Sequence, residues 1–269
     1  MRGSRRSFAA ALALSLAAVP AHAQERGDDW VERCRRWNRS DGRQVHCEVR
    51  ETRLRADGSL SVDGRQNGGV SVRAWDGADV LVRAQIQTQA PSAAEAREIA
   101  REITVRTGGE TVAAQGPEVG RRQSWSVSYE VFVPRRTNLQ LRTNNGPISV
   151  NGVAGEMDLQ AHNGPLTLRE VAGDVRGRTT NGPVTVTLAG SSWSGAGLDV
   201  ETTNGPVTLA IPEGYSAHLE TGTVNGPMSI DFPVTVQGRV TRRISTDLGR
   251  GGAPIRVLTT NGPVTVRER

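Results

Sequence analysis

The sequence predicts an all-β fold, a single-stranded β-helix or β-solenoid with coils of about 18 residues and one short covering helix. The first observation is that the octapeptide TTNGPVTV occurs twice word for word, at Thr179–Val186 and Thr259–Val266. Near copies begin at Thr143, Ala161, Thr202 and Thr223. The second observation is the spacing of 18, 18, 23, 21 and 36 residues between their asparagines, Asn145, Asn163, Asn181, Asn204, Asn225 and Asn261. A period that varies by small insertions is typical of stacked coils.

The Asn-Gly-Pro tripeptide predicts a corner between two strands. Asn-Gly is a common hairpin turn, but proline cannot donate to a strand ladder and suits the first position of a strand. Proline also disfavours helical conformations in the residue before it. We therefore expect every asparagine to lie at the same corner of successive coils, where the side-chain amides form a hydrogen-bonded ladder. A ligand-binding amide array is the alternative use of this row.

Residues on both sides of the corner alternate with a period of two, as in strands with one buried face. The inward positions are apolar and become small near the corner. In the coil of Asn181 they are Val175, Gly177, Thr179, Val184 and Val186. The resulting interior is thin, which agrees with an aromatic content of only 4%.

The outward positions five and three residues before each asparagine carry charges. They form one row of Asp158, Arg176, Asp199 and Glu220 and a second row with Arg178 and Glu201. Stacking in sequence order places Arg176 beside Asp199 and Arg178 beside Glu201, as cross-strand ion pairs. Paired carboxylates for glycoside hydrolysis are the alternative interpretation, which the interleaved arginines and short loops disfavour.

The N-terminus predicts an export signal peptide over residues 1–23. Arg2, Arg5 and Arg6 precede an apolar stretch that reaches Val19, and the small residues Ala21–Ala23 form a cleavage site. An ordinary secretory signal and a twin-arginine signal both remain open. No other apolar run reaches the roughly 20 residues that span a bilayer. We therefore expect an extracytoplasmic protein, periplasmic, secreted or at the cell surface.

Residues 24–57 are polar, Arg-rich and loop-like. They contain both cysteines, Cys34 and Cys47, which in an oxidising compartment predict a disulfide that closes a short loop. Two cysteines with one nearby histidine, His46, are too few ligands for a structural zinc site.

Residues 58–137 predict an irregular β-rich region. Asn67 begins a variant of the corner motif in which glycine replaces proline. Ser92 and Glu95 form a capping box that predicts a helix over 92–103, with Ala96, Ile99, Ala100 and Ile103 as its apolar stripe. We expect this helix to cover an open end or flank of the sheet, where an exposed edge invites aggregation.

Residues 138–269 form the predicted NGP-repeat solenoid. Between Phe232 and Pro254 the repeat loses its motif, which predicts a degenerate coil or a protruding loop. The chain ends on a strand followed by Arg267, Glu268 and Arg269, charged residues that read as protection of an exposed final edge.

The NGP coils, the segment VPRRTNLQL at 133–141 and the ending GGAPIRVLTTNGPVTV at 251–266 resemble the bacterial "putative adhesin" family of repeat β-solenoid domains. The resemblance covers roughly Leu60 to Arg267. It implies an extracytoplasmic, right-handed β-helix-like domain, and it transfers architecture better than activity.

Composition and motifs exclude several function classes. Every basic residue is arginine, and the formal charge of +5 becomes +2 without the three signal arginines (30 basic against 28 acidic residues), so no nucleic-acid partner is expected. The sequence has no cofactor motif, no metal-ligand pair of histidines and no catalytic motif, so we expect no cofactor and no enzyme activity. The row of outward serines and threonines after each corner also permits ice binding, although β-propensity explains it.

The candidate ligand-binding residues are Trp193 and Tyr215, on insertions in successive coils opposite the asparagine corner. Stacked rings would make an aromatic shelf for sugars or a partner protein; the alternative is that Trp193 folds back as a lid over the core. The expected function is a non-enzymatic binding or structural module of the cell envelope, whose partner is an envelope glycan or protein. A polysaccharide-acting β-helix enzyme and a self-associating envelope scaffold are the alternatives.

Overall fold

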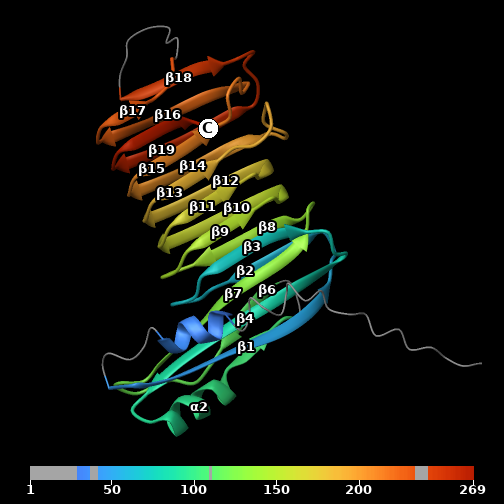
Figure 1. Cartoon of the computed structure of the whole chain (residues 1–269), viewed down its shortest axis with the longest axis vertical. Coiled ribbons are helices and arrows are strands. Elements are labelled where there is room, and N and C mark those ends of the chain that lie inside the picture. Colours follow the sequence, from blue (N-terminus) through green and yellow to red (C-terminus); the bar gives the residue numbers. More distant parts are fainter. Residues whose placement is uncertain (1–28, 37–41, 109–110, 234–241) are drawn as a thin grey trace, which may run out of the picture.

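A computed structural model describes residues 29–36, 42–108, 111–233 and 242–269. In it two long sheets face each other over the length of the molecule (Figure 1). Sheet A contains, in spatial order, β1 (Gln44–Arg55), β4 (Asp79–Ala90), β7 (Ser124–Pro134), β3 (Val70–Trp75), β9 (Ile148–Asn151), β11 (Leu166–Arg169), β13 (Val184–Thr187), β15 (Val207–Ile211), β20 (Val264–Glu268) and β17 (Met228–Ile230). Sheet B contains β18 (Arg243–Leu248), β16 (Ala217–Asn225), β19 (Pro254–Asn261), β14 (Gly197–Asn204), β12 (Ala172–Asn181), β10 (Ala154–Asn163), β8 (Asn138–Thr143), β2 (Ser59–Asp63), β6 (Thr111–Gln115) and β5 (Thr104–Arg106).

Each Asn-Gly-Pro corner carries the chain from a strand of sheet B to the next strand of sheet A. The chain passes from β10 through Asn163, Gly164 and Pro165 into β11, and the other coils repeat this path. Neighbouring coils pair in parallel with corresponding residues opposite one another, as in Leu166 opposite Val184. The inward side chains of both sheets fill one continuous core. The all-β prediction is confirmed, and the architecture is β-solenoid-like.

The corner asparagines form the expected ladder. Each Nδ2 donates to the Oδ1 of the next asparagine, at 2.7 Å from Asn181 to Asn163 and at 3.2 Å from Asn145 to Asn67. In spatial order the ladder runs through Asn67, Asn145, Asn163, Asn181, Asn204, Asn261 and Asn225. The variant corner Asn67-Gly68-Gly69, in which Gly69 stands in place of the proline, therefore belongs to a coil, formed by β2 and β3.

In most coils the threonine two residues before the asparagine donates a hydrogen bond that the proline of the neighbouring coil cannot donate. Gly182 N–H donates to the Asn204 carbonyl and Val184 N–H to the Pro206 carbonyl, so the Gly182 carbonyl faces the nitrogen of Pro206, which has no hydrogen. The Thr202 hydroxyl donates to this carbonyl instead, at 2.9 Å. The same bond recurs in three other coils, from Thr179 to Gly164, Thr259 to Gly205 and Thr223 to Gly262.

The one NGP coil with alanine at this position shows the same requirement. Ala161 has no hydroxyl for the Gly146 carbonyl that faces Pro165. The Thr143 hydroxyl, from the same coil as Gly146, donates to that carbonyl at 2.8 Å. The Gly146 carbonyl thus receives its hydrogen bond from a threonine of its own coil instead of one from the neighbouring coil.

The corner glycines allow the coils to approach. A Cβ on Gly182 would stand 2.1 Å from the Gly164 carbonyl oxygen, and the corner glycines 164, 205, 226 and 262 meet a neighbouring corner carbonyl in the same way. Substitution there requires the backbone of two coils to separate. The asparagine of the corner thus forms the amide ladder, and the glycine allows the close approach of neighbouring coils.

The coils do not stack in sequence order, contrary to expectation. β19 and β20, the last coil of the chain, lie between β14/β15 and β16/β17. At the other end, β6 and β7 lie outside β2 and β3 although they follow them in sequence. The final strand β20 is therefore an interior strand, and the interpretation of Arg267, Glu268 and Arg269 as protection of an exposed final edge is wrong.

The segment between Phe232 and Pro254 contains a strand. β18 pairs antiparallel with β16, on the side away from β19, and residues 234–241 are outside the described part of the chain. β18 is the outermost described strand at one end of sheet B, and the degenerate coil or protruding loop stays a prediction for residues 234–241.

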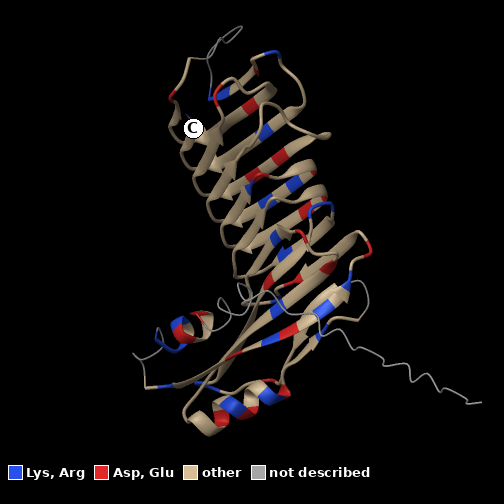
Figure 2. Cartoon of the chain, turned by 45° about the vertical axis from the view of Figure 1, so that its right-hand side comes forward, with Lys and Arg blue, Asp and Glu red and all other residues tan. Residues whose placement is uncertain are grey.

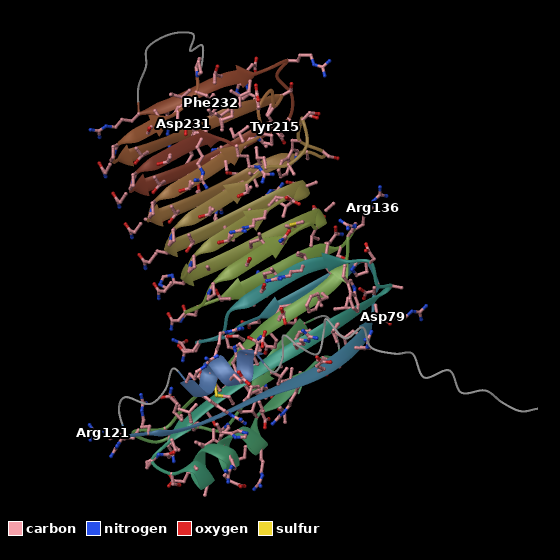
Figure 3. All side chains as sticks on the ribbon, viewed as in Figure 1. Asp79, Arg121, Arg136, Tyr215, Asp231 and Phe232 are labelled. Carbon is pink, nitrogen blue, oxygen red and sulfur yellow. A yellow bond between two sulfur atoms is a disulfide. The ribbon has the colours of Figure 1, made fainter. Side chains whose placement is uncertain are left out.

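The loop-like interpretation of residues 24–57 is wrong for the described residues 29–36 and for β1. Residues 29–36 are helical, and β1 runs for 12 residues antiparallel to β4. Its pattern escaped notice because most of its side chains are polar and partly exposed on both faces of an outermost strand. The predicted disulfide joins Cys34 of the helical segment to Cys47 of β1, the yellow bond in Figure 3. The predicted signal peptide, residues 1–23, lies outside the described residues.

The predicted helix is α2, Ala93–Glu102, with the Ser92 hydroxyl accepting from Glu95 N–H at its start. Its predicted apolar stripe is buried, and the helix packs beside β4 and β1. Arg50 of β1 donates to the carbonyls of Ala100 and Ile103 at the C-terminal end of the helix. A cation there satisfies free carbonyls and complements the helix dipole.

The substitution Thr143→Val should lower the free energy of unfolding by about 1–3 kcal/mol, because it leaves the Gly146 carbonyl without its donor. Adding Ala161→Thr should recover most of this loss, since position 161 is where the other coils carry the donor. Denaturant unfolding of both variants measures the difference. Thr203→Val, at an exposed position of β14, is the control. Failure of Ala161→Thr to recover stability would show that the hydroxyl is not what the corner needs.

Candidate binding surface

The outer face of sheet B carries a row of alternating charges. In spatial order the row is Gln140, Asp158, Arg176, Asp199, Arg256 and Glu220. Figure 2 shows blue and red bands alternating from strand to strand across this face. The predicted register of Arg176 opposite Asp199 and Arg178 opposite Glu201 is present. Arg178 bonds to Glu201 at 2.9 Å, whereas Arg176 bonds to Asp174 of its own strand at 3.2 Å.

Arg256 is the centre of this row, and the order of the coils along the chain did not indicate this position. It forms an ion pair with Asp199 and lies 3.6 Å from Glu201 and 3.7 Å from Glu220. Burial acts to lower the pKa of Arg256, but the hydrogen bond to Asp199 and the three carboxylate charges outweigh it, so the pKa is raised. In sequence order Asp199 and Glu220 would be neighbours with like charges; the inserted coil places Arg256 between them.

A groove of about 1180 Å³, lined by both polar and apolar residues, runs along this face. Its floor includes Asp158, Gln160, Arg176, Arg178 and Asp199, from successive coils. Its wall at one end is formed by residues 54 and 55 of β1, residue 57 after it and residue 80 of β4. The Arg176 and Arg178 side chains are 70% and 69% exposed. The groove thus offers guanidinium, amide and carboxylate groups that remain open to a ligand.

The aromatic shelf predicted at Trp193 and Tyr215 is wrong. Both side chains are buried, at 8% and 3% exposure, and belong to the core. Trp193 Nε1–H donates to the Gly173 carbonyl at 3.0 Å, so the indole closes the core opposite the asparagine corner, as the lid alternative describes. Burial raises the pKa of Tyr215 to about 12; Figure 3 labels it toward the C-terminal end of the stack.

An aromatic contact does occur elsewhere, on the outer face of sheet A. The rings of Trp75 and Phe132 lie 5.9 Å apart, and the Arg83 guanidinium lies 5.3 Å from the Phe132 ring centre. Arg83 is buried and bonds to Glu51 at 2.6 Å and Glu130 at 3.2 Å. Sequence patterns could not find this cluster, because its members come from four strands whose pairing is out of sequence order.

His218 makes the hydrogen bonds of a serine–histidine–aspartate relay. Its Nδ1 lies 2.7 Å from Asp247 Oδ1, and its Nε2 lies 2.9 Å from Ser245 Oγ. The three residues face one another across the β16–β18 pair, and His218 and Asp247 are 43% and 67% exposed. A nucleophilic serine needs a shielded site with oriented oxyanion donors. We interpret the trio as a cross-strand contact that holds β18 on β16.

Metal ions and membrane spans find no support in the part of the chain that is described. No three histidine, cysteine, aspartate or glutamate side chains there gather into a metal-binding group. None of the helices described there has the length and apolar character needed to cross a membrane.

The fold and the surface define a β-solenoid-like protein with an open groove whose floor carries polar side chains, an architecture suited to binding. Residues 56–267 match the Toastrack DUF4097 family, so the chain belongs to that family. The family resemblance found in the sequence is thereby confirmed. No curated protein matches the chain.

Several solved structures are similar. A "putative cell adhesion protein" from Clostridium sporogenes has 9% identity and a TM-score of 0.47, covering 84% of this chain and 100% of that one. A "putative adhesin" from Bacteroides fragilis has 11% identity and a TM-score of 0.38, covering 82% and 97%. A "putative lipid binding protein" from Parabacteroides distasonis has 10% identity and a TM-score of 0.30, covering 83% and 97%.

The substitution Arg256→Ala should lower the free energy of unfolding by about 1 kcal/mol at low salt, because three carboxylates lose their shared cation. The loss should shrink as salt screens the remaining repulsion. Thermal unfolding at two ionic strengths measures it. Arg267→Ala is the control, since Arg267 lies exposed in the same coil on sheet A. Equal effects of the two variants would contradict a role for Arg256 between Asp199 and Glu220.

Proposed function

We propose that the protein binds an extended, hydroxyl-rich glycan of the cell envelope along the outer face of sheet B. The observation that carries this proposal is the groove, in which β8, β10, β12 and β14 contribute two, three, three and one planar polar side chains. Because coils repeat every ~4.8 Å, such a floor offers the same kind of contact many times over. A repeating floor suits a repeating polymer better than a single small molecule.

The chemistry of the groove favours hydroxyl groups over a strongly charged ligand. Arginines donate hydrogen bonds and carboxylates accept them, and both types line the groove, alternating along the row of Asp158, Arg176 and Asp199. Arg176 and Arg178 are held by Asp174 and Glu201, which orients their free N–H groups without removing them from solvent. A polyanion or polycation would meet a like charge along this row.

The proposed function is non-enzymatic. A glycosidase needs a general acid in apolar surroundings beside a second carboxylate. In the groove, Asp158 accepts from Gln160, Asp174 binds Arg176 and Asp199 binds Arg256. These carboxylates have polar, partly exposed surroundings, which suit ligand binding.

The location and winding of the fold belong to the same proposal. The Cys34–Cys47 disulfide supports a site of action outside the cytoplasm, where disulfides persist. We further propose that the coils wind to the right with a base length of 18 residues, because parallel crossover connections are right-handed in nearly all sheets. Asparagine partners separated by 18 residues support this length.

The double substitution Arg176→Ala/Arg178→Ala should weaken binding to an envelope glycan by tenfold or more, because two charge-assisted donors are lost. Binding is measured on an array of purified envelope glycans with the disulfide-bonded protein.

The matched control is Arg169→Ala/Arg267→Ala, which removes two exposed arginines from sheet A. Equal binding by both double variants would place the site outside the groove. Absence of any glycan binding by the unaltered protein would contradict the proposed function itself.

A further inference from the structure

The last coil of the chain occupies a slot between two coils that precede it in sequence. β19 pairs with β14 on one side and β16 on the other, and β20 lies likewise between β15 and β17. The slot is therefore formed entirely by residues outside the coil that fills it. Any segment with the same sequence meets the same partners there.

Contacts on both sides of the slot recognise this coil. Asn261 continues the amide ladder to Asn204 and Asn225, at 2.8 Å on each side. The Thr259 hydroxyl donates to the Gly205 carbonyl. Arg256 faces carboxylates from both neighbouring strands. The buried Ile255, Val257, Val264 and Val266 complete the core.

The coil surfaces are interchangeable. β14 and β15 have TTNGPVTV on both sides: Thr179–Val186 on one and Thr259–Val266 on the other. One coil thus accepts the same octapeptide through either of its edges. Recognition depends on the sequence of the segment, and covalent continuity with the slot is not needed.

The connection into the last coil has the features of a hinge. Residues 249–253 pass from β18 to β19 across the start of β16, with Arg250 N–H bonded to Ser216 Oγ at 3.2 Å. Gly249, Gly251 and Gly252 have φ of 54°, 71° and 142°, conformations that suit glycine. Unfolding this short loop frees the coil, and β16 and β17 regain their ladder partners when a coil of the same sequence fills the slot.

We propose that β19 and β20 of one molecule insert into the slot of a second copy of this chain, so that two molecules associate by exchange of their last coil. Every contact of the closed monomer is then made between molecules, as in domain swapping. Exchange depends on concentration, because the closed form benefits from a high effective concentration of its own coil.

Cross-linking between two single-cysteine variants tests the exchange. Positions 203 and 260 lie side by side on β14 and β19, between paired residues, and both are exposed. Full-length Thr203→Cys and Thr260→Cys chains are mixed at high concentration, unfolded and refolded together with the native disulfide intact. A short bismaleimide should then give a covalent dimer that contains one chain of each kind.

The matched control mixes Thr203→Cys with Thr180→Cys, whose positions are neighbours on β14 and β12, two strands that stay in place. No dimer is expected from that pair. Absence of a dimer from the first pair, or equal dimer from both pairs, would overturn the proposal. A hinge variant, Gly251→Ala, should raise the dimer yield several-fold, because a left-handed φ strains alanine only while the loop stays closed; a lower or unchanged yield would also contradict the exchange.

Discussion

The structure depends on a missing hydrogen at each corner. Proline starts the sheet A strand of each NGP coil, and its nitrogen leaves the carbonyl of the neighbouring corner glycine without a ladder partner. A threonine hydroxyl on the inner side replaces that partner, as Thr202 does for Gly182. The bare glycine lets the coils close to ladder distance, and the asparagine ties the outer side. The repeated octapeptide therefore combines residues that depend on one another: the threonine replaces the donor that the proline lacks, and the glycine and asparagine join neighbouring corners.

The same repeat makes coils alike, so a second interaction must set their order. Backbone ladders, amide ladders and aliphatic cores would accept many stacking orders. The charges on the outer face of sheet B discriminate among them, since the observed order gives Asp158, Arg176, Asp199, Arg256 and Glu220 in alternation. A stack in sequence order would place two carboxylates side by side. Electrostatics thus contributes little to the stability of each coil but favours the observed topology.

Local features could be predicted from the sequence. The corner, the two inward rows and the cap of α2 depend on residues within one coil or one helical turn, and the asparagine ladder follows from the repetition of the corner at a regular spacing. The position of the last coil could not be predicted by spacing, because a step of 36 residues looks like two regular coils. A signal was nevertheless present: Arg256 occupies the charge row, and sequence order would have paired Asp199 with Glu220.

Features that depend on distant strands were missed or misread. Trp193 looked exposed because nothing near it in sequence buries an indole, whereas its partner is the Gly173 carbonyl of another coil. β1 looked like a loop because its polar residues bond to β4 and to the end of α2, as Arg50 does. The groove could not be predicted for the same reason, because the residues of its wall and floor are far apart in the chain.

The coupling between Thr202 and Pro206 tests the corner account most directly. Pro206→Ala supplies an N–H that faces the Gly182 carbonyl, so that carbonyl no longer depends on the Thr202 hydroxyl. Denaturant unfolding of a double-mutant cycle with Thr202→Val measures the coupling. The account predicts that Thr202→Val costs about 1–3 kcal/mol beside proline and less than about 0.5 kcal/mol beside alanine. An equal cost in both backgrounds would show that the hydroxyl does not replace the missing proline donor.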